Sequence, residues 1–381
     1  MRLIEYLELK DKVRKELSSL IPENRKRIVE RDSHAKRKPI GCGLTIHVGY
    51  GCTNRCLYCY IQDMDLSFTS VTSNPLTGLE LVYALTLNPY FVPGKLGTFL
   101  AFGSITEPFH KVNVSKTLDY MKCIKKYLGN PIQFSTKMYI DLELAKKIRD
   151  AAGRNVSPLV SIVTIKMADR LEPNAPPPHL RLETIRNLRK VGLKPQLFMR
   201  PVIPTITDVE ADTIISLAKS YGSVSIVIGG FRITNRIINR LKEIYPIDRI
   251  LIYAKRLPHG KEQIPLNIIH VRRKILEKAR KFNLTCHLHA CCACAYTHSV
   301  PCWNLCWLKN GCTHCNNECW SKQPKITEED VREVLEHLNV KCKNITITER
   351  EIVLRIKSKR SPRELPVILS TLTKRKVKIL K

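Results

Sequence analysis

Acidic residues are scarce in this sequence of 381 residues, and long apolar runs are missing from it. Lysine and arginine together number 64, whereas aspartate and glutamate number 34, so the formal net charge is +30. A lysine-rich composition of thermophilic type raises glutamate together with lysine, which is not the pattern here. The excess favours a polyanionic partner, and DNA or tRNA is the commonest. No apolar run reaches the roughly 18–20 residues that span a bilayer, so no membrane partner is expected.

The N-terminus lacks the apolar core of a secretory signal peptide. Residues 1–20 alternate charged and apolar side chains, which predicts an amphipathic helix in a cytoplasmic protein. Residues 24–38 are polar and basic, so we expect an arm or linker there and a first region over 1–40. Hydrophobic residues make up 44% of the chain, enough for a full core.

Short β-rich runs alternate with longer runs of helical periodicity between residues 41 and 245. Strands are expected at 44–50, 97–103, 132–136, 159–165, 196–202 and 223–230, and helices at 77–88, 115–128, 141–152, 179–192 and 209–222. This alternation predicts an α/β fold with a parallel sheet buried on both faces. Six βα units form either an open doubly wound sheet or an incomplete barrel, and in both the ligands bind at the carboxyl ends of the strands.

The remaining third of the chain divides into three parts by composition. Residues 246–285 are expected to connect as helix and loop, and 286–320 are rich in cysteine. Residues 325–381 contain a capped helix, two strand-like runs and a basic tail, which together predict a small basic α/β appendix.

Cysteine is the most informative residue type, with 15 copies. In a cytosolic chain this number indicates metal ions or clusters rather than disulfides. Cys42, Cys123 and Cys342 stand apart from the others and are expected to be buried small residues or spare thiols.

The first set of cysteines is Cys52, Cys56 and Cys59, directly after the first predicted strand. A structural zinc ion normally has four protein ligands, so three leave a vacancy. A [4Fe–4S] cluster held by three cysteines has one iron free to bind another molecule. Two alternatives are a zinc site with a remote fourth ligand and simple buried thiols.

The stretch "CTNRCLYC" (52–59) resembles the signature of the radical S-adenosylmethionine (SAM) superfamily, including the aromatic Tyr58 before the third cysteine. The resemblance implies that the amine and carboxylate of SAM bind the open iron. It also implies that an electron, from a donor such as ferredoxin or flavodoxin, cleaves SAM to a 5′-deoxyadenosyl radical. That radical abstracts a hydrogen atom from the substrate, while the protein supplies position and dryness.

Several later stretches resemble the spore photoproduct lyase group within that superfamily. They are "FGSITEPFH" (102–110), "STK" (135–137), the run from 161 to 193 that contains "LEPNAPPPHLRL", "RPVIPTITD" (200–208) and "GGFRIT" (229–234). The resemblance implies a partial (βα)6 radical SAM barrel. It also implies that the following residues bind SAM or substrate: Tyr58, Ser104, Thr106, Glu107, Ser135, Lys137, Ser161, Arg200 and Arg232. Glu107 would accept from the SAM amine, and Lys137 and Arg200 would pair with its carboxylate.

One position departs from the lyase pattern. Spore photoproduct lyases have a cysteine just before the segment that resembles "FGSITEPFH" (102–110), which returns a hydrogen atom to the product radical, and this chain has Ser104 near that place. A hydroxyl group is a poor hydrogen-atom donor, so the departure indicates a different substrate or a different source of hydrogen.

The second set of cysteines comprises nine residues between Cys286 and Cys319. It predicts a second metal centre, either one or two auxiliary [4Fe–4S] clusters or a zinc site, with a disulfide knot as a third possibility. The expected ligands are Cys312, Cys315 and Cys319 with Cys302 or Cys306 as a fourth, and a further group of Cys291, Cys292 and Cys294.

Three functions are compatible with these patterns. The preferred one is a radical SAM enzyme that modifies or repairs nucleic acid, either DNA or tRNA. The second is a radical SAM enzyme with an auxiliary cluster that acts on a peptide, a lipid or a small anion. The third is a non-catalytic protein that binds zinc and nucleic acid.

Overall fold

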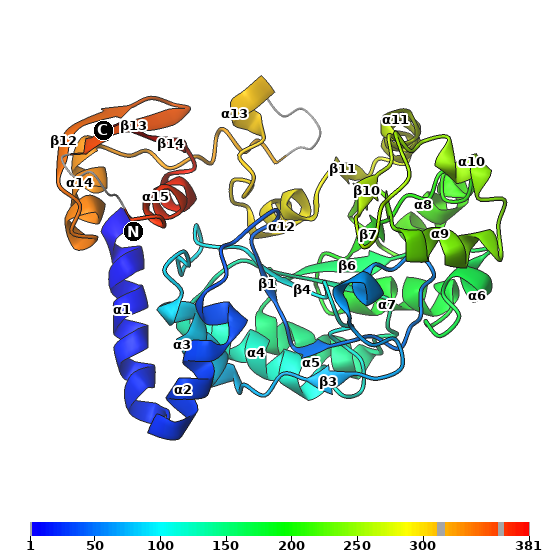
Figure 1. Ribbon diagram of the computed structural model, residues 1–381, viewed down its shortest axis with the longest axis horizontal. Helices are drawn as coiled ribbons and strands as arrows, with labels where there is room; N and C mark the ends of the chain where they lie inside the picture. Colours follow the sequence, from blue (N-terminus) through cyan, green and yellow to red (C-terminus); the bar gives the residue numbers. More distant parts are fainter. Residues whose placement is uncertain (1, 311–316, 357–361, 381) are drawn as a thin grey trace.

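The computed structural model describes residues 2–310, 317–356 and 362–380. At its centre is a seven-stranded parallel sheet with the strand order β1-β4-β5-β6-β7-β8-β11 (Figure 1). The strands are β1 (Leu44–Ile46), β4 (Leu100–Phe102), β5 (Ile132–Thr136), β6 (Ser157–Ser161), β7 (Gln196–Met199), β8 (Ser225–Ile228) and β11 (Thr285–His287). The predicted parallel α/β sheet is confirmed as a partial barrel, and it has one strand more than the six expected.

The outer face of the sheet is covered by the helices that connect successive strands. They are α3 (Gly78–Leu87), α4 (Val114–Tyr127), α5 (Leu142–Ala152), α7 (Pro178–Lys190), α8 (Ala211–Ser220) and α11 (Ile269–Lys281), which pack against one another in series. Three further helices of this region are α6 (Ala168–Leu171), α9 (Asn235–Lys242) and α10 (Asp248–Leu251). Local sequence sets where they begin: Thr77 and Glu80 form a capping box for α3, and the predicted Asp141 cap accepts from the Leu144 N–H at 2.7 Å. Their buried apolar stripes join the main core.

Helix α12 (Ala290–His298) lies on the other side of the sheet from α4 and α5 (Figure 1). Its residues Ala290 and Ala293 pack with Leu159, Phe198 and Val227, which come from three neighbouring strands. Small side chains allow the helix to lie close to the strands. The inner face of the partial barrel is therefore covered by the first helix of the cysteine-rich region.

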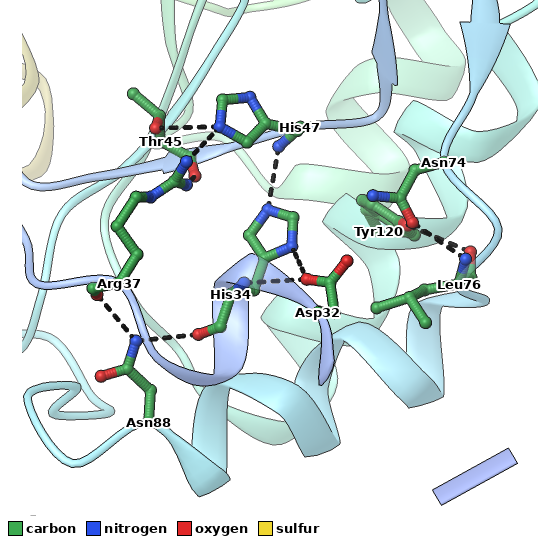
Figure 2. Close-up of polar contacts among 9 residues, drawn as sticks. All are labelled: Asp32, His34, Arg37, Thr45, His47, Asn74, Leu76, Asn88 and Tyr120. Carbon is green, nitrogen blue, oxygen red and sulfur yellow. Dashed lines mark hydrogen bonds and ion pairs between the residues drawn. The ribbon is translucent and has the colours of Figure 1, made fainter. Parts of the chain in front are cut away.

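The N-terminal region is more ordered than an arm. It forms the predicted first helix, α1 (Leu3–Leu20), and then α2 (Glu23–Arg31) and the short 3₁₀ helix η1 (Ser33–Ala35). Polar contacts fasten it to the barrel (Figure 2). The His34 ring lies 2.6 Å from Asp32 Oδ1 and accepts from the His47 backbone N–H at 3.0 Å.

A second layer of contacts completes this network. Asn88, just after α3, donates to the carbonyl oxygens of His34 at 2.8 Å and Arg37 at 2.9 Å, and Arg37 donates to the ring of His47 (Figure 2). Burial and the Arg37 charge lower the pKa of His47 to about 3. His47 therefore stays neutral and accepts, which the approach of the Arg37 cation requires.

The C-terminal appendix is a separate small α/β unit. It contains α14 (Glu328–His337), α15 (Leu365–Thr373) and a three-stranded sheet of β12 (Cys342–Ile347), β13 (Glu351–Ile356) and β14 (Lys376–Leu380). Its apolar core includes Leu3, Ile4 and Leu7 of α1. Figure 1 shows α1 running from the appendix along the barrel, so one helix joins the two units.

The other elements are short. They are the strand pairs β2 (Gly49–Tyr50) with β3 (Thr72–Ser73) and β9 (Arg232–Ile233) with β10 (Ile264–Pro265), the 3₁₀ helix η2 (Ile61–Met64), and α13 (Trp307–Asn310). None of the helices in the described ranges is both long and apolar enough to cross a membrane.

Candidate functional site

The first cysteine set and the other expected site residues lie at one end of the barrel. Cys52, Cys56 and Cys59 are on the loop between β2 and η2, which follows β1. The remaining residues follow or end successive strands: Thr106 and Glu107 after β4, Lys137 after β5, Ser161 at the end of β6, Arg200 after β7, and Arg232 in β9 after β8. The carboxyl ends of parallel strands share one edge, so the fold gathers these residues on its ligand-binding face.

The three thiols are largely protected from water. Cys56 is 6% exposed. Burial raises the pKa of Cys52 to about 11, and it also raises the pKa values of Cys56 and Cys59. Buried thiols of this kind ionise when a metal supplies positive charge, because a coordinating thiol is deprotonated by the ion. The donor set therefore suits a metal cluster.

The spacing of these sulfurs is wider than a single ion requires. Among the described residues, only Cys291, Cys292 and Cys302 form a group of potential ligands whose atoms all lie within 4.8 Å of one another. The sulfurs of Cys52, Cys56 and Cys59 do not meet that limit. A cubane cluster binds each thiolate through a different iron, so its ligands are naturally farther apart.

Lys137 brings a positive charge to this loop. Its Nζ lies 5.5 Å from the centre of the Tyr58 ring and 4.0 Å from Glu172 Oε1. Burial disfavours the ammonium form, but the charges of Cys56 and Glu172 outweigh burial and raise the pKa of Lys137. Lys137 therefore remains a cation beside the cysteines.

A buried ion pair fixes the cysteine loop through Tyr58. Sequence reasoning did not assign this pair to the site. Glu172 and Arg181 pair with both side chains fully buried, and the Tyr58 hydroxyl donates to Glu172. Arg181 also donates to the carbonyl oxygens of Pro176 at 2.6 Å and Ser161 at 3.2 Å. Both residues belong to the "LEPNAPPPHLRL" stretch, which was the available signal, but the stretch alone does not disclose a contact with residue 58.

Backbone contacts reinforce this anchor. The Leu57 N–H donates to the Leu171 carbonyl at 2.9 Å, and the Asn174 side chain donates to the Thr53 carbonyl at 3.0 Å. On the other flank, the Arg240 guanidinium of α9 donates to the Cys59 carbonyl at 2.7 Å. The loop is thus fixed between two distant parts of the barrel.

Glu107 is buried at 6% exposure and is already hydrogen-bonded. It accepts from the Thr136 hydroxyl at 2.5 Å and from the Lys137 backbone N–H at 3.0 Å. Burial raises its pKa, and these donors oppose the rise. A carboxylate offers about four acceptor positions, so capacity for a further donor remains. Thr106 accepts from the Asn113 side chain at 3.1 Å, which gives it a structural partner.

The serines differ in their surroundings. The Ser135 hydroxyl donates to the Gly103 carbonyl at 3.2 Å, and Ser161 is buried with its carbonyl bound by Arg181. The Ser104 hydroxyl is buried and has no hydrogen-bond partner among the described residues. An unpaired buried hydroxyl is costly, so this atom suits contact with a bound molecule.

Arg200 and Arg232 are the exposed members of the set. Both lie close enough to Tyr60 to oppose the burial that raises the pKa of its hydroxyl. Tyr60 donates in turn to the Ser104 carbonyl at 3.0 Å. The two exposed arginines therefore lie near Tyr60, which directly follows Cys59 in the cysteine loop.

The second cysteine set is grouped differently from the sequence-based expectation. Cys291, Cys292 and Cys302 form the tight group, and Cys42, expected to stand apart, accepts from the Cys291 N–H at 3.3 Å. Cys319 accepts from the Cys302 N–H at 3.3 Å, and Cys306 lies beside Cys302. Cys294 is fully buried in the same apolar cluster but is not part of the group of three. Cys312 and Cys315 lie outside the described residues.

Comparison with known proteins gives similarities of fold and one weak relative. No model of a known protein family matches the chain. The uncharacterized protein ORF301 of Acidianus two-tailed virus is 27% identical over 182 residues, which cover 44% of this chain and 58% of that protein. The chain thus spans little more than half the length of the curated relative that it matches.

Among solved structures, a variant of spore photoproduct lyase matches with a TM-score of 0.51 at 13% identity, over 62% of this chain and 72% of that one. Another variant, solved with dinucleoside spore photoproduct, matches with a TM-score of 0.51 at 14% identity over the same shares. The chain therefore has the fold of spore photoproduct lyase over 62% of its length.

Proposed function

We propose that this protein is a radical SAM enzyme that binds a [4Fe–4S] cluster through Cys52, Cys56 and Cys59 and modifies or repairs a nucleic acid, DNA or tRNA. The observation that carries the proposal is the placement of three widely spaced thiols, one buried and two half-buried, on the first loop of a lyase-type barrel, beside Lys137. The fold favours a radical SAM enzyme, and the three cysteines are the residues that would hold its cluster.

When bound, the cluster and SAM supply a 5′-deoxyadenosyl radical. The side chains of this protein bind and orient SAM and the substrate. Glu107 has acceptor capacity for the SAM amine, and Arg200 offers a guanidinium for its carboxylate. The Ser104 hydroxyl lacks a partner among the described residues, so it is a donor or acceptor for SAM or substrate. Burial of Cys56 and Tyr58 keeps water from the reacting atoms.

Nucleic acid is favoured as substrate by charge. The net charge is +30, and two exposed arginines, Arg200 and Arg232, lie near Tyr60 in the cysteine loop. Each phosphate neutralised by a basic side chain releases counterions, which drives binding. Ser104 in place of a hydrogen-donating cysteine supports a reaction different from thymine-dimer repair. The electron comes from a donor such as ferredoxin or flavodoxin.

The catalytic proposal is tested by anaerobic reconstitution with iron and sulfide, followed by reduction with dithionite in the presence of SAM. We expect 5′-deoxyadenosine from the natural protein and from a Cys123→Ala control, whose cysteine is buried away from the site. Cys56→Ala should form none. Equal product from Cys56→Ala would refute the cluster assignment.

The substrate proposal is tested by measuring binding to tRNA and to duplex DNA over a series of salt concentrations. We expect the logarithm of the affinity to fall steeply and linearly with the logarithm of the salt concentration. Replacing an arginine that contacts a phosphate should make this slope shallower by about 1. Arg232→Gln is the variant, and Arg154→Gln, on the α5–β6 loop, is the control. Binding that is weak and insensitive to salt would favour a peptide, lipid or small-anion substrate instead.

A further inference from the structure

Two cysteines at the start of α12, Cys291 and Cys292, and one after its end, Cys302, are arranged for a single metal ion. The Cys302 and Cys291 sulfurs are 3.5 Å apart, and those of Cys302 and Cys292 are 3.9 Å apart. A tetrahedral ion with Zn–S bonds of about 2.3 Å holds its sulfurs roughly 3.8 Å apart. A disulfide would require about 2.05 Å, and all described cysteines are free. The spacing therefore matches a mononuclear thiolate site.

Cys42 supplies a fourth sulfur from a distant part of the chain. It lies two residues before β1, and its sulfur accepts from the Cys291 N–H at 3.3 Å. It also packs in the apolar clusters formed by α12 and the inner face of the sheet. The Cys42 sulfur lies outside the group of three, so it must move toward that group on metal binding to complete the four-sulfur coordination that structural zinc prefers.

A buried lysine beside the group has no carboxylate partner among the described residues. Lys374, which follows α15, is 1% exposed, and its Nζ donates to the Leu96 carbonyl at 2.7 Å. The same Nζ lies 5.7 Å from the ring centres of both Phe99 and Trp303. Within the described part of the chain, no ion pair includes Lys374.

A buried charge without a counter-charge is strongly unfavourable. The nearest groups able to carry negative charge are the sulfurs of Cys302 and Cys319. A divalent ion with four thiolates bears a net negative charge, which gives the Lys374 ammonium its partner. Burial lowers the pKa of Lys374 to about 7, and a negatively charged metal–thiolate site would favour its ammonium form.

We propose that Cys42, Cys291, Cys292 and Cys302 bind one zinc-like divalent ion. The four thiol protons are released as the thiolates bind the ion. The site ties together the segment before β1, helix α12 on the inner face of the barrel and, through Lys374, the C-terminal appendix. It is structural, and it is independent of the proposed radical chemistry.

The test measures metal content in a protein whose radical SAM site is disabled. The Cys52/Cys56/Cys59→Ala triple variant should retain about one zinc per chain. Adding Cys302→Ala or Cys42→Ala should remove it, whereas adding Cys123→Ala should not. Zinc that remains after Cys42→Ala but is lost after Cys306→Ala or Cys319→Ala would overturn the assignment of the fourth ligand.

A second measurement leaves all four proposed zinc ligands in place and so does not depend on how their variants fold. The zinc of the triple variant is exchanged for Co²⁺, and the absorption spectrum is recorded. We expect intense sulfur-to-metal charge transfer and the visible bands of a tetrahedral ion. Iron and sulfide in place of zinc, or a cobalt spectrum without thiolate bands, would overturn the proposal.

Discussion

The two cysteine sets use the same residue type in opposite ways. Cys52, Cys56 and Cys59 lie on a loop at the ligand-binding face of the barrel, and their sulfurs are spread beyond 4.8 Å. Cys291, Cys292 and Cys302 lie within that limit against the inner face of the sheet, next to an unpaired buried lysine. Spacing and neighbouring charge, more than the number of thiols, distinguish a site built for a reactive cluster from one built for a structural ion.

The largest expected effect is that variants of the two cysteine sets lose different metals. Cys56→Ala should lose iron, sulfide and all 5′-deoxyadenosine formation while it keeps its zinc. Cys302→Ala should lose zinc and keep the iron of the first site, because the two sets share no ligand. Elemental analysis of both variants after anaerobic purification checks this. Loss of both metals from either variant would show that the sets form one centre.

The next effect concerns the anchor of the first set. Glu172→Gln leaves the guanidinium of Arg181 buried without its counter-charge, so the free energy of unfolding should fall by about 3–5 kcal/mol. Urea denaturation of the metal-free protein measures it. The matched control is Glu183→Gln, which breaks the exposed pair with Arg186 and should cost only about 0–1 kcal/mol. Similar losses in both variants would contradict the anchoring role.

A smaller effect is a pH dependence at His47, in the network that fastens the N-terminal region to the barrel. The pKa of His47 is about 3 in the folded protein and about 6.5 in the unfolded chain, so the unfolded chain takes up the proton first. The contribution of neutral His47 to the stability of the folded protein is therefore complete above pH 6.5 and is lost as the pH falls toward 3. At pH 5 the loss is roughly 2 kcal/mol.

The check is urea denaturation at pH 7 and pH 5 for the natural protein and for His47→Gln. The variant has no group that titrates at this position, so its stability should fall by about 2 kcal/mol less between the two pH values. Identical pH dependence in the two proteins would contradict a neutral, buried His47.

The smallest expected effect comes from Arg240. Replacement by lysine weakens the hydrogen bond to the Cys59 carbonyl and the stacking on Phe68, 5.1 Å from the ring centre, and should cost about 1 kcal/mol. Thermal unfolding measures it, and zinc content should not change. A change in zinc content would mean that the sets are coupled through the barrel.

Local patterns predicted the fold better than they predicted the site. The strand at 132–136 and the Asp141 helix cap follow from periodicity and capping, which act over a few residues. Strand β11 was missed because three residues beside a dense cysteine run give no alternation. The pairing of Glu172 with Tyr58 joins positions 114 apart. The contact of Cys42 with Cys291 joins positions 249 apart. Only the folded chain brings such positions together, so neither spacing nor composition reveals them.

The proposed radical chemistry depends most on one iron of the first cluster being left without a protein ligand. Electron paramagnetic resonance of the dithionite-reduced protein, with and without SAM, examines that iron directly. We expect a reduced [4Fe–4S] signal whose g values shift when SAM is added, and no such signal in Cys56→Ala. A signal that is unchanged by saturating SAM would contradict the proposed radical chemistry.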